Sequence, residues 1–411
     1  MPLRSTSSIS ESSRDAARRR RASRRRSRIA VALTAFAVAA LAVAALSNAG
    51  SQSSPRTAGA PVKATDTSGT LGTAVEPSAP ATRPASVKPA PALPATLTVA
   101  AVGDMHFDRQ VKQLIEREGG LAPLVHVAAH LSAADVTVGN LESPLSNGGT
   151  PWPDKDVRFR GDPRAIEGIK ASGFTFLSLA NNHILDYGAE ALRDTVLALD
   201  TAGVRYAGAG ANRSAAWKPA VAAYGETTVA FLSFSHILPA GFIATDSRAG
   251  LAPGRTDMEA VARAISAAKE EHDYVIVSFH WGVEYKDNAN AGQIRDGRVA
   301  IDAGANMVLS HHPHVIQGVE FYNGGLIAYS LGDFVFDHYS RRTGEAFILD
   351  AELGPHGVAN VRATPVYLQG FGQPKFVHGT EATSILERLK AISGPHGTSV
   401  IIEGDTARLV P

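Results

Sequence analysis

The sequence contains no cysteine in its 411 residues. This absence excludes disulfide bonds, thiolate metal sites and cysteine nucleophiles, so any bound metal must be held by His, Asp, Glu or Asn. Aromatic residues are also few, and the mixed charge and moderate apolar content are ordinary for a globular protein. The length corresponds to more than one average domain and fewer than three.

Most of the chain also lacks a basic excess. Residues 1–28 hold ten arginines against Glu11 and Asp15, whereas the whole chain carries a net charge of only +1. The remainder is therefore net acidic, which argues against a nucleic-acid partner for the folded part. We interpret residues 1–28 as a basic arm, because an arginine block directly before an apolar run is typical of a membrane-topology signal.

Residues 29–46 form an uncharged apolar run in which Thr34 is the one hydroxyl residue. As a helix this run would span roughly 27 Å, close to the thickness of a bilayer core. The preceding arginines predict a cytoplasmic N-terminus, a single-pass transmembrane signal anchor and a C-terminal domain outside the cell membrane. A cleaved signal peptide is the alternative, with small residues at 47–50 as the cleavage site, and it would secrete the domain.

Residues 47–95 are rich in Ala, Pro, Ser, Thr and Gly and contain almost no large apolar residues. Such a segment cannot bury enough surface to offset its ordering entropy, which predicts a disordered linker. Over residues 96–411, short β-branched or apolar runs alternate with amphipathic segments. This alternation predicts one α/β domain with a largely parallel sheet and a more antiparallel part after residue 346.

The predicted elements follow from these periodicities. Strands are predicted at 97–102, 135–138, 174–180, 228–234, 274–279, 307–310, 326–331 and 346–352, and helices near 163–171, 189–202, 257–271 and 293–303.

Five of the predicted strands are followed by metal-binding residue types. In open α/β sheets, ligands bind outside the carboxyl ends of the strands. Taken singly, each of these segments also fits a turn, a helix start or a surface histidine. Together they hold six of the 14 histidines, and imidazole with carboxylate and amide oxygens suits Mn, Fe or Zn. The chemistry-bearing residues of the five segments are Asp104 and His106, Glu142, Asn182 and His183, His280, and His311, His312 and His314.

As a set, the segments around these residues are highly specific. In chain order they read VGDMHFDR, GNLESPL, SLANNHILDYG, SFHWGVEY, DAGANMVLSHHPHVIQGVE and IAYSLGDFVFD. With them, residues 96–337 resemble the capsule-synthesis CapA family, which is associated with poly-gamma-glutamate production. That family looks like a branch of the calcineurin-like metallophosphoesterases, so the resemblance implies a four-layer αββα sandwich.

The resemblance also implies a site with two divalent metal ions. In that reading Asp104, His106 and His314 hold one ion, Asn182, His280 and His312 hold the other, and Glu142 bridges them. His183 would be a non-ligand that stabilises the transition state or protonates the leaving group. Asp186 would either orient His183 or cap the following helix. The chain departs from the family pattern at Ser310, usually Gly, at Asp333, usually Asn, and at Glu142, where the superfamily mostly uses Asp; none of these changes removes a ligand.

Two functions remain open from the sequence. One is metal-dependent hydrolysis of a phosphoester or a polymer bond. The other is non-enzymatic binding, export or anchoring of an anionic capsular polymer, with Arg109, Arg158 and Arg160 either lining an anion path or simply solvated. A purely structural surface protein is disfavoured by the full ligand set. The predicted partners are an anionic polymer or phosphoester, the membrane and, by family analogy alone, other polymer-synthesis membrane proteins.

Overall fold

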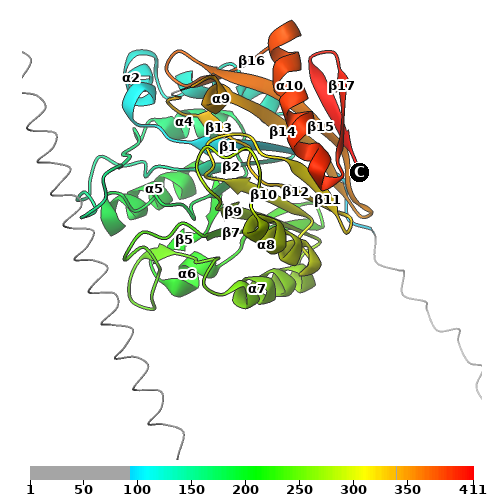
Figure 1. Ribbon diagram of the computed structural model, residues 1–411. Coiled ribbons are helices and arrows are strands. Elements are labelled where there is room, and N and C mark those ends of the chain that lie inside the picture. The colour runs from blue at the N-terminus through cyan, green and yellow to red at the C-terminus, as the bar shows by residue number, and fades with distance from the viewer. Residues whose placement is uncertain (1–92, 339) are drawn as a thin grey trace, which may run out of the picture. The chain divides into compact units, whose positions relative to one another are not determined.

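The computed structural model describes residues 93–338 and 340–411 (Figure 1). The predicted basic arm, the apolar run at 29–46 and nearly all of the predicted linker lie outside these residues. Within the described part, no helix combines the length and apolar character needed to cross a membrane. The predicted anchor therefore stays a prediction.

The first sheet combines a parallel half with an antiparallel half. Its path runs β17-β18-β15-β14-β1-β2-β3-β4, with β13 paired to β1 and β16 paired to β15. The strands β1 to β4 are parallel, whereas β14, β15, β18 and β17 form antiparallel pairs. The bounds are β1 Leu97–Met105, β2 Val136–Leu141, β3 Phe176–Ser178, β4 Arg205–Ala207, β13 Asp333–Val335, β14 Glu345–Gly354, β15 Gly357–Gln369, β16 Gln373–Phe376, β17 Ser399–Glu403 and β18 Thr406–Val410.

The second sheet has the order β11-β12-β10-β9-β7-β6. Its four central strands are parallel, and the outer strands β11 and β6 are antiparallel to their neighbours. The bounds are β6 Ala220–Tyr224, β7 Thr227–Ser235, β9 Tyr274–His280, β10 Met307–His311, β11 Val319–Tyr322 and β12 Gly325–Ala328, and a separate ribbon pairs β5 Ala209–Gly210 with β8 Gly250–Leu251.

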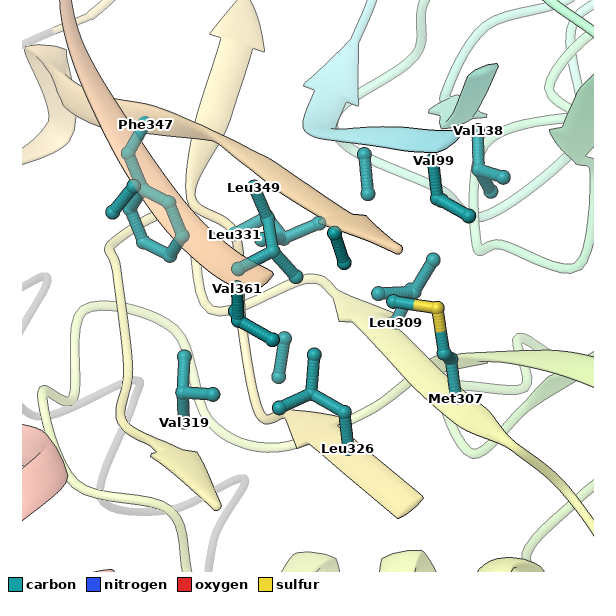
Figure 2. Packing of buried hydrophobic residues seen from close by; sticks show 14 of the residues in the cluster. Val99, Val138, Met307, Leu309, Val319, Leu326, Leu331, Phe347, Leu349 and Val361 are labelled. Carbon is teal, nitrogen blue, oxygen red and sulfur yellow. The ribbon is translucent and has the colours of Figure 1, made fainter. Parts of the chain in front are cut away.

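The two sheets pack face to face through alternating apolar side chains. Val99 on β1 and Leu349 on β14 lie in one buried cluster with Met307 and Leu309 on β10 (Figure 2). Ala100, the residue after Val99 in β1, lies in a different buried cluster on the outer face of the sheet. Successive side chains of a strand point to opposite faces, so this change of face is expected. Each fully buried side chain of this size stabilises the fold by about 1.5–3 kcal/mol.

Helices cover the outer faces of both sheets (Figure 1). The helices α2, α4 and α5 contribute buried apolar residues to the cluster on the outer face of the first sheet. The helices α7 and α8 do the same on the second sheet, and α10 joins the cluster between the sheets. The bounds are α2 Arg109–Glu118, α3 Ala128–Leu131, α4 Ala165–Ala171, α5 Gly188–Ala202, α6 Arg213–Trp217, α7 Met258–Glu271, α8 Ala291–Asp302, α9 Arg341–Gly344 and α10 Gly379–Ser393, with 3₁₀ turns at Ala122–Leu124 and Gly394–His396.

Side-chain caps fix where α7 and α8, the two helices that pack on the second sheet, begin. Asp257 accepts a hydrogen bond from the Ala260 amide at 2.8 Å, and Asn290 forms a capping box with Gln293. Such caps stabilise a helix by about 1 kcal/mol each. The predicted α/β architecture is confirmed, including the antiparallel part after residue 346, which contains the β14–β15 pair. The predicted largely parallel sheet is instead two sheets, each with parallel and antiparallel strands.

Candidate metal centre

Carboxyl ends of strands from both sheets meet at one site. Asp104 lies in β1, and the register of the first sheet places it opposite Asn140 of β2. His280 ends β9, and the register of the second sheet places it opposite His311 at the end of β10. Strand pairing therefore brings together segments that are far apart in the sequence, as the predicted parallel sheet requires.

Three overlapping groups of donor atoms lie at this site. In each group the potential ligand atoms lie within 4.8 Å of one another. Glu142, the predicted bridging carboxylate, belongs to two of the groups, as do His312 and His314. The groups are Glu142, His280 and His312; Asp104, Glu142 and His314; and Glu284, His312 and His314.

Buried donor atoms without partners fit a cation at this site. Among the described residues, Glu142 Oε1 and His312 Nδ1 are buried and have no hydrogen-bond partner. A buried polar atom left unsatisfied costs about 1–3 kcal/mol, so such atoms need an explanation. Carboxylate and imidazole donors in this arrangement fit a divalent metal ion.

The two central carboxylates have opposite electrostatic environments. Burial and the negative charge of Asp104 raise the pKa of Glu142 well above its usual range. For Asp104, burial acts in the same direction, but His311, His314 and His280 outweigh it and lower the pKa. Asp104 Oδ1 lies 3.3 Å from His311 Nδ1, and Oδ2 accepts the His312 amide at 3.0 Å. A cation beside Glu142 would favour its charged form in the same way.

His280 and His312, which the second sheet carries, are held in the neutral form, which is the form that binds metals. Burial, followed by the nearby His312, lowers the pKa of His280 well below its usual range. Burial, followed by the nearby His314, lowers the pKa of His312 to about 3. Both imidazoles are therefore neutral near pH 7, as coordination requires. His280 Nε2 lies 2.7 Å from Asn182 Oδ1 and 3.5 Å from Glu142 Oε1, which brings three predicted ligands together.

His314 is oriented by a carboxylate that departs from the family pattern. Its Nδ1 lies 2.8 Å from Asp333 Oδ1 in a buried contact. Burial raises the pKa of Asp333 to about 7, although the neighbouring His314 opposes the rise. A carboxylate bound to one ring nitrogen fixes the ring and directs the other nitrogen toward a metal.

His106, in contrast, is not among the grouped donors. Its Nε2 is hydrogen-bonded to Asp337, and its Nδ1 accepts the Asp108 amide at 3.2 Å. The ring also stacks on Phe159, with the centroids 4.5 Å apart. Both nitrogens of this predicted ligand are thus engaged within the protein.

His183 lies beside two groups that control its proton. Its Nδ1 is 2.6 Å from Asp186 Oδ2, the contact that the predicted orienting role of Asp186 requires. Lys155 pairs with Asp186, and its Nζ lies 2.9 Å from His183 Nδ1. Burial lowers the pKa of His183 to about 4, although Asp186 opposes this shift. Lys155 was not predicted, since a lone lysine in a polar loop carries no sequence signal.

The loop that carries Lys155 forms one wall of the site. Phe159 contacts His183 with ring centroids 4.3 Å apart, and the guanidinium of Arg109 lies 4.6 Å from the Phe159 ring centre. Arg160 lies over the Tyr187 ring at 4.4 Å, and Arg158 Nε donates to a backbone carbonyl at 2.9 Å. Of these cations, Arg109 is paired with Asp337 and Lys155 with Asp186, whereas no ion pair to an acidic side chain is formed by Arg158 or Arg160 among the described residues.

Comparison with known proteins identifies a family and several relatives that the described domain resembles in sequence. Residues 98–338 match the family described as bacterial capsule synthesis protein PGA_cap. The chain is 34% identical over 284 residues to the capsule biosynthesis protein CapA of Bacillus anthracis, covering 68% of this chain and 69% of that protein. It is 33% identical over 272 residues to the PGA biosynthesis protein CapA of Bacillus subtilis, covering 66% and 71%. It is also 33% identical over 231 residues to a probable polyglutamine synthesis accessory protein of Mycobacterium tuberculosis, covering 54% and 61%.

Proposed function

Because this chain belongs to the bacterial capsule synthesis family PGA_cap, we propose that it serves poly-gamma-glutamate capsule synthesis as a metal-dependent hydrolase. The bond cleaved would be a phosphoester or a bond of the polymer. The observation that carries this proposal is that the buried Glu142 carboxylate is grouped with His280 and His312 and also with Asp104 and His314. A shared carboxylate is what two adjacent divalent ions require.

We assign the other donors to two sides of the centre. Asp104 and His314 would hold one ion with Glu142, and Asn182, His280 and His312 would hold the other with Glu142. A pair of divalent ions supplies Lewis acidity and lowers the pKa of a water molecule. The two-sheet layering with helices on both outer faces supports a fold of the calcineurin-like metallophosphoesterase type.

The protein's own contribution to proton transfer centres on His183. When its Nδ1–H donates to Asp186, Nε2 is the atom that accepts a proton. When Lys155 donates to Nδ1 instead, Nε2–H is the donor to a substrate oxygen. Asp186 also stabilises the imidazolium that forms when both ring nitrogens are protonated. Lys155 and Asp186 thus select the role of His183, and Phe159 excludes water from one face of the ring.

The cationic wall supports an anionic substrate. Among the described residues, neither Arg158 nor Arg160 forms an ion pair with an acidic side chain. Both are half-buried, and a guanidinium without an acidic partner can bind a carboxylate or phosphate of a ligand. The same observation favours a second candidate function, in which the domain binds, exports or anchors an anionic capsular polymer without turnover. We also propose that residues 29–46 anchor the domain outside the cell membrane.

Metal content and turnover measured on the same purified protein test this proposal. Elemental mass spectrometry is expected to find about two divalent ions per chain, and a generic phosphodiester is expected to be hydrolysed until a chelator is added. Two ions without turnover would support the polymer-binding function instead. A protein with no bound metal after refolding with Mn, Fe and Zn would contradict the assignment of donors to both ions.

A further inference from the structure

We propose that Glu284 is an additional metal ligand on the solvent side of this centre; the inference depends on the metal centre proposed above. The Glu284 carboxylate lies within 4.8 Å of ligand nitrogens of both His312 and His314. The family resemblance assigns no role to Glu284, and neither does the sequence pattern.

The segment around Glu284 is held by the histidine-bearing segment. The Trp281 amide donates to the His311 carbonyl at 3.1 Å, and the Tyr285 amide donates to the Pro313 carbonyl at 2.8 Å. These two backbone hydrogen bonds lie on either side of Glu284. An exposed glutamate is usually mobile, but here the backbone that carries it is fixed next to both imidazoles.

Backbone strain at the next residue supports a constrained position. Tyr285 has a φ of 62°, in the left-handed region that bulky residues rarely adopt. Such a conformation costs about 1–3 kcal/mol and is found mainly where surrounding contacts enforce it, often at functional sites. The strain therefore indicates that the turn is built to place this segment, and the Glu284 carboxylate with it.

The donor sets on the two sides of the centre are unequal without Glu284. One side holds four candidate donors, namely Asn182, Glu142, His280 and His312. On the other side the grouped donors are Asp104, Glu142 and His314, and His106 lies outside the groups with its Nε2 hydrogen-bonded to Asp337. Glu284 forms no ion pair or hydrogen bond with another described residue, so its carboxylate is available to an ion beside His312 and His314.

The added carboxylate bears on which cation the centre prefers. Glu284 would add a third carboxylate to a centre that already contains Asp104 and Glu142, and carboxylate oxygens suit Mn²⁺ better than softer ions. Glu142 is fully buried, whereas Glu284 is exposed, so Glu284 is the ligand that an incoming substrate oxygen can displace.

Calorimetric titration of the metal-depleted full-length protein with Mn²⁺ tests this inference. Glu284→Gln is expected to weaken one of two Mn²⁺ sites by about tenfold or more and to leave the other unchanged. Glu284→Asp, which shortens the reach, is expected to give an intermediate loss. Glu226→Gln is the matched control, because Glu226 is exposed in the turn between β6 and β7 and lies in none of the three donor groups.

The possible outcomes separate the two proposals. Wild-type affinity at both sites in Glu284→Gln and Glu284→Asp would overturn the assignment of Glu284 and leave the centre intact. No Mn²⁺ binding by the wild-type protein would overturn the centre itself. Circular dichroism checks that each variant is folded, which is expected because Glu284 is exposed.

Discussion

The two sides of the candidate centre use histidine in opposite ways. On the second-sheet side, His280 ends its strand with Asn182 and Glu142 beside it. On the first-sheet side, His106 follows its strand just as directly, yet Asp337 and the Asp108 amide occupy both of its nitrogens. A ligand-type residue at a strand end can therefore lie among grouped donors, as His280 does, or among hydrogen-bond partners, as His106 does, and His106 stays a predicted ligand.

The largest effect is expected for His280→Ala. This change removes one donor of the ion that Asn182, His312 and Glu142 would also hold. The affinity for that ion should fall by more than the roughly 10–100-fold seen when an outer-shell partner is lost. Elemental mass spectrometry after dialysis is expected to find one ion per chain instead of two. His378→Ala, an exposed histidine paired with Asp405, is the control and should keep both ions.

His106→Ala tests the other side directly. We expect both ions to remain, while the free energy of unfolding falls by about 2 kcal/mol because a buried, stacked ring is lost. Denaturant titration and metal content measured on the same sample give the two values. Metal loss equal to that of His280→Ala would show that His106 is a ligand and that the contrast between the sides is wrong.

Lys155→Met is expected to lower turnover about tenfold without changing metal content, because His183 loses a charged neighbour but no metal donor. Assay of a generic phosphodiester at saturating metal measures this effect. Lys155→Arg should recover part of the activity, and Lys170→Met, an exposed lysine of α4, should leave it unchanged. Loss of metal together with activity would instead make Lys155 part of the scaffold.

The smallest effect concerns the pair of His130 in α3 and Asp350 in β14, which like His106 and Asp337 lies outside the grouped donors. A hydrogen bond of 2.9 Å from His130 Nε2 to the accepting Asp350 Oδ1 raises the pKa of the half-buried His130. The stabilisation is therefore fully present below the unfolded histidine pKa of about 6.5 and is lost as the pH rises through the higher folded value. Because the pair is partly exposed, its contribution is about 1 kcal/mol or less.

The change Asp350→Asn checks this pair. Its destabilising effect on the free energy of unfolding should be larger at pH 5.5 than at pH 9. Denaturant titrations at the two pH values measure it, with His130→Gln as the background in which the pH dependence should disappear. An equal effect at both pH values would mean that the pair does not titrate on folding.

Local patterns in the sequence were sufficient for much of the fold. Each predicted strand and helix coincides with an observed element, because apolar periodicity reports burial directly. The elements that the predictions missed include α2, α10, the edge strands β6 and β11, and the β17–β18 hairpin. The last strand, β18, alternates between buried and partly exposed residues, and β17 exposes most of its residues, so neither produces a strong apolar run.

The candidate site was predictable only in part. The strand-end segments identified Asp104, Glu142, Asn182, His280, His312 and His314, which the sheets bring together. The partners that tune them come from distant segments, such as Asp337, which lies 231 residues from His106. Such contacts depend on how the two sheets pack, and no local pattern encodes them. Lys155 and Glu284 escaped prediction for the same reason.

The division of donors between the two sheets has a consequence for the lifetime of the protein. Asp104 and Glu142 belong to the first sheet, and His280 and His312 belong to the second, so a bound ion would cross-link the halves of the sandwich. Metal at 100 times its dissociation constant would add about 2.7 kcal/mol to the free energy of unfolding. The protein without metal would then unfold more often and be cleaved faster by a protease than the protein with metal bound.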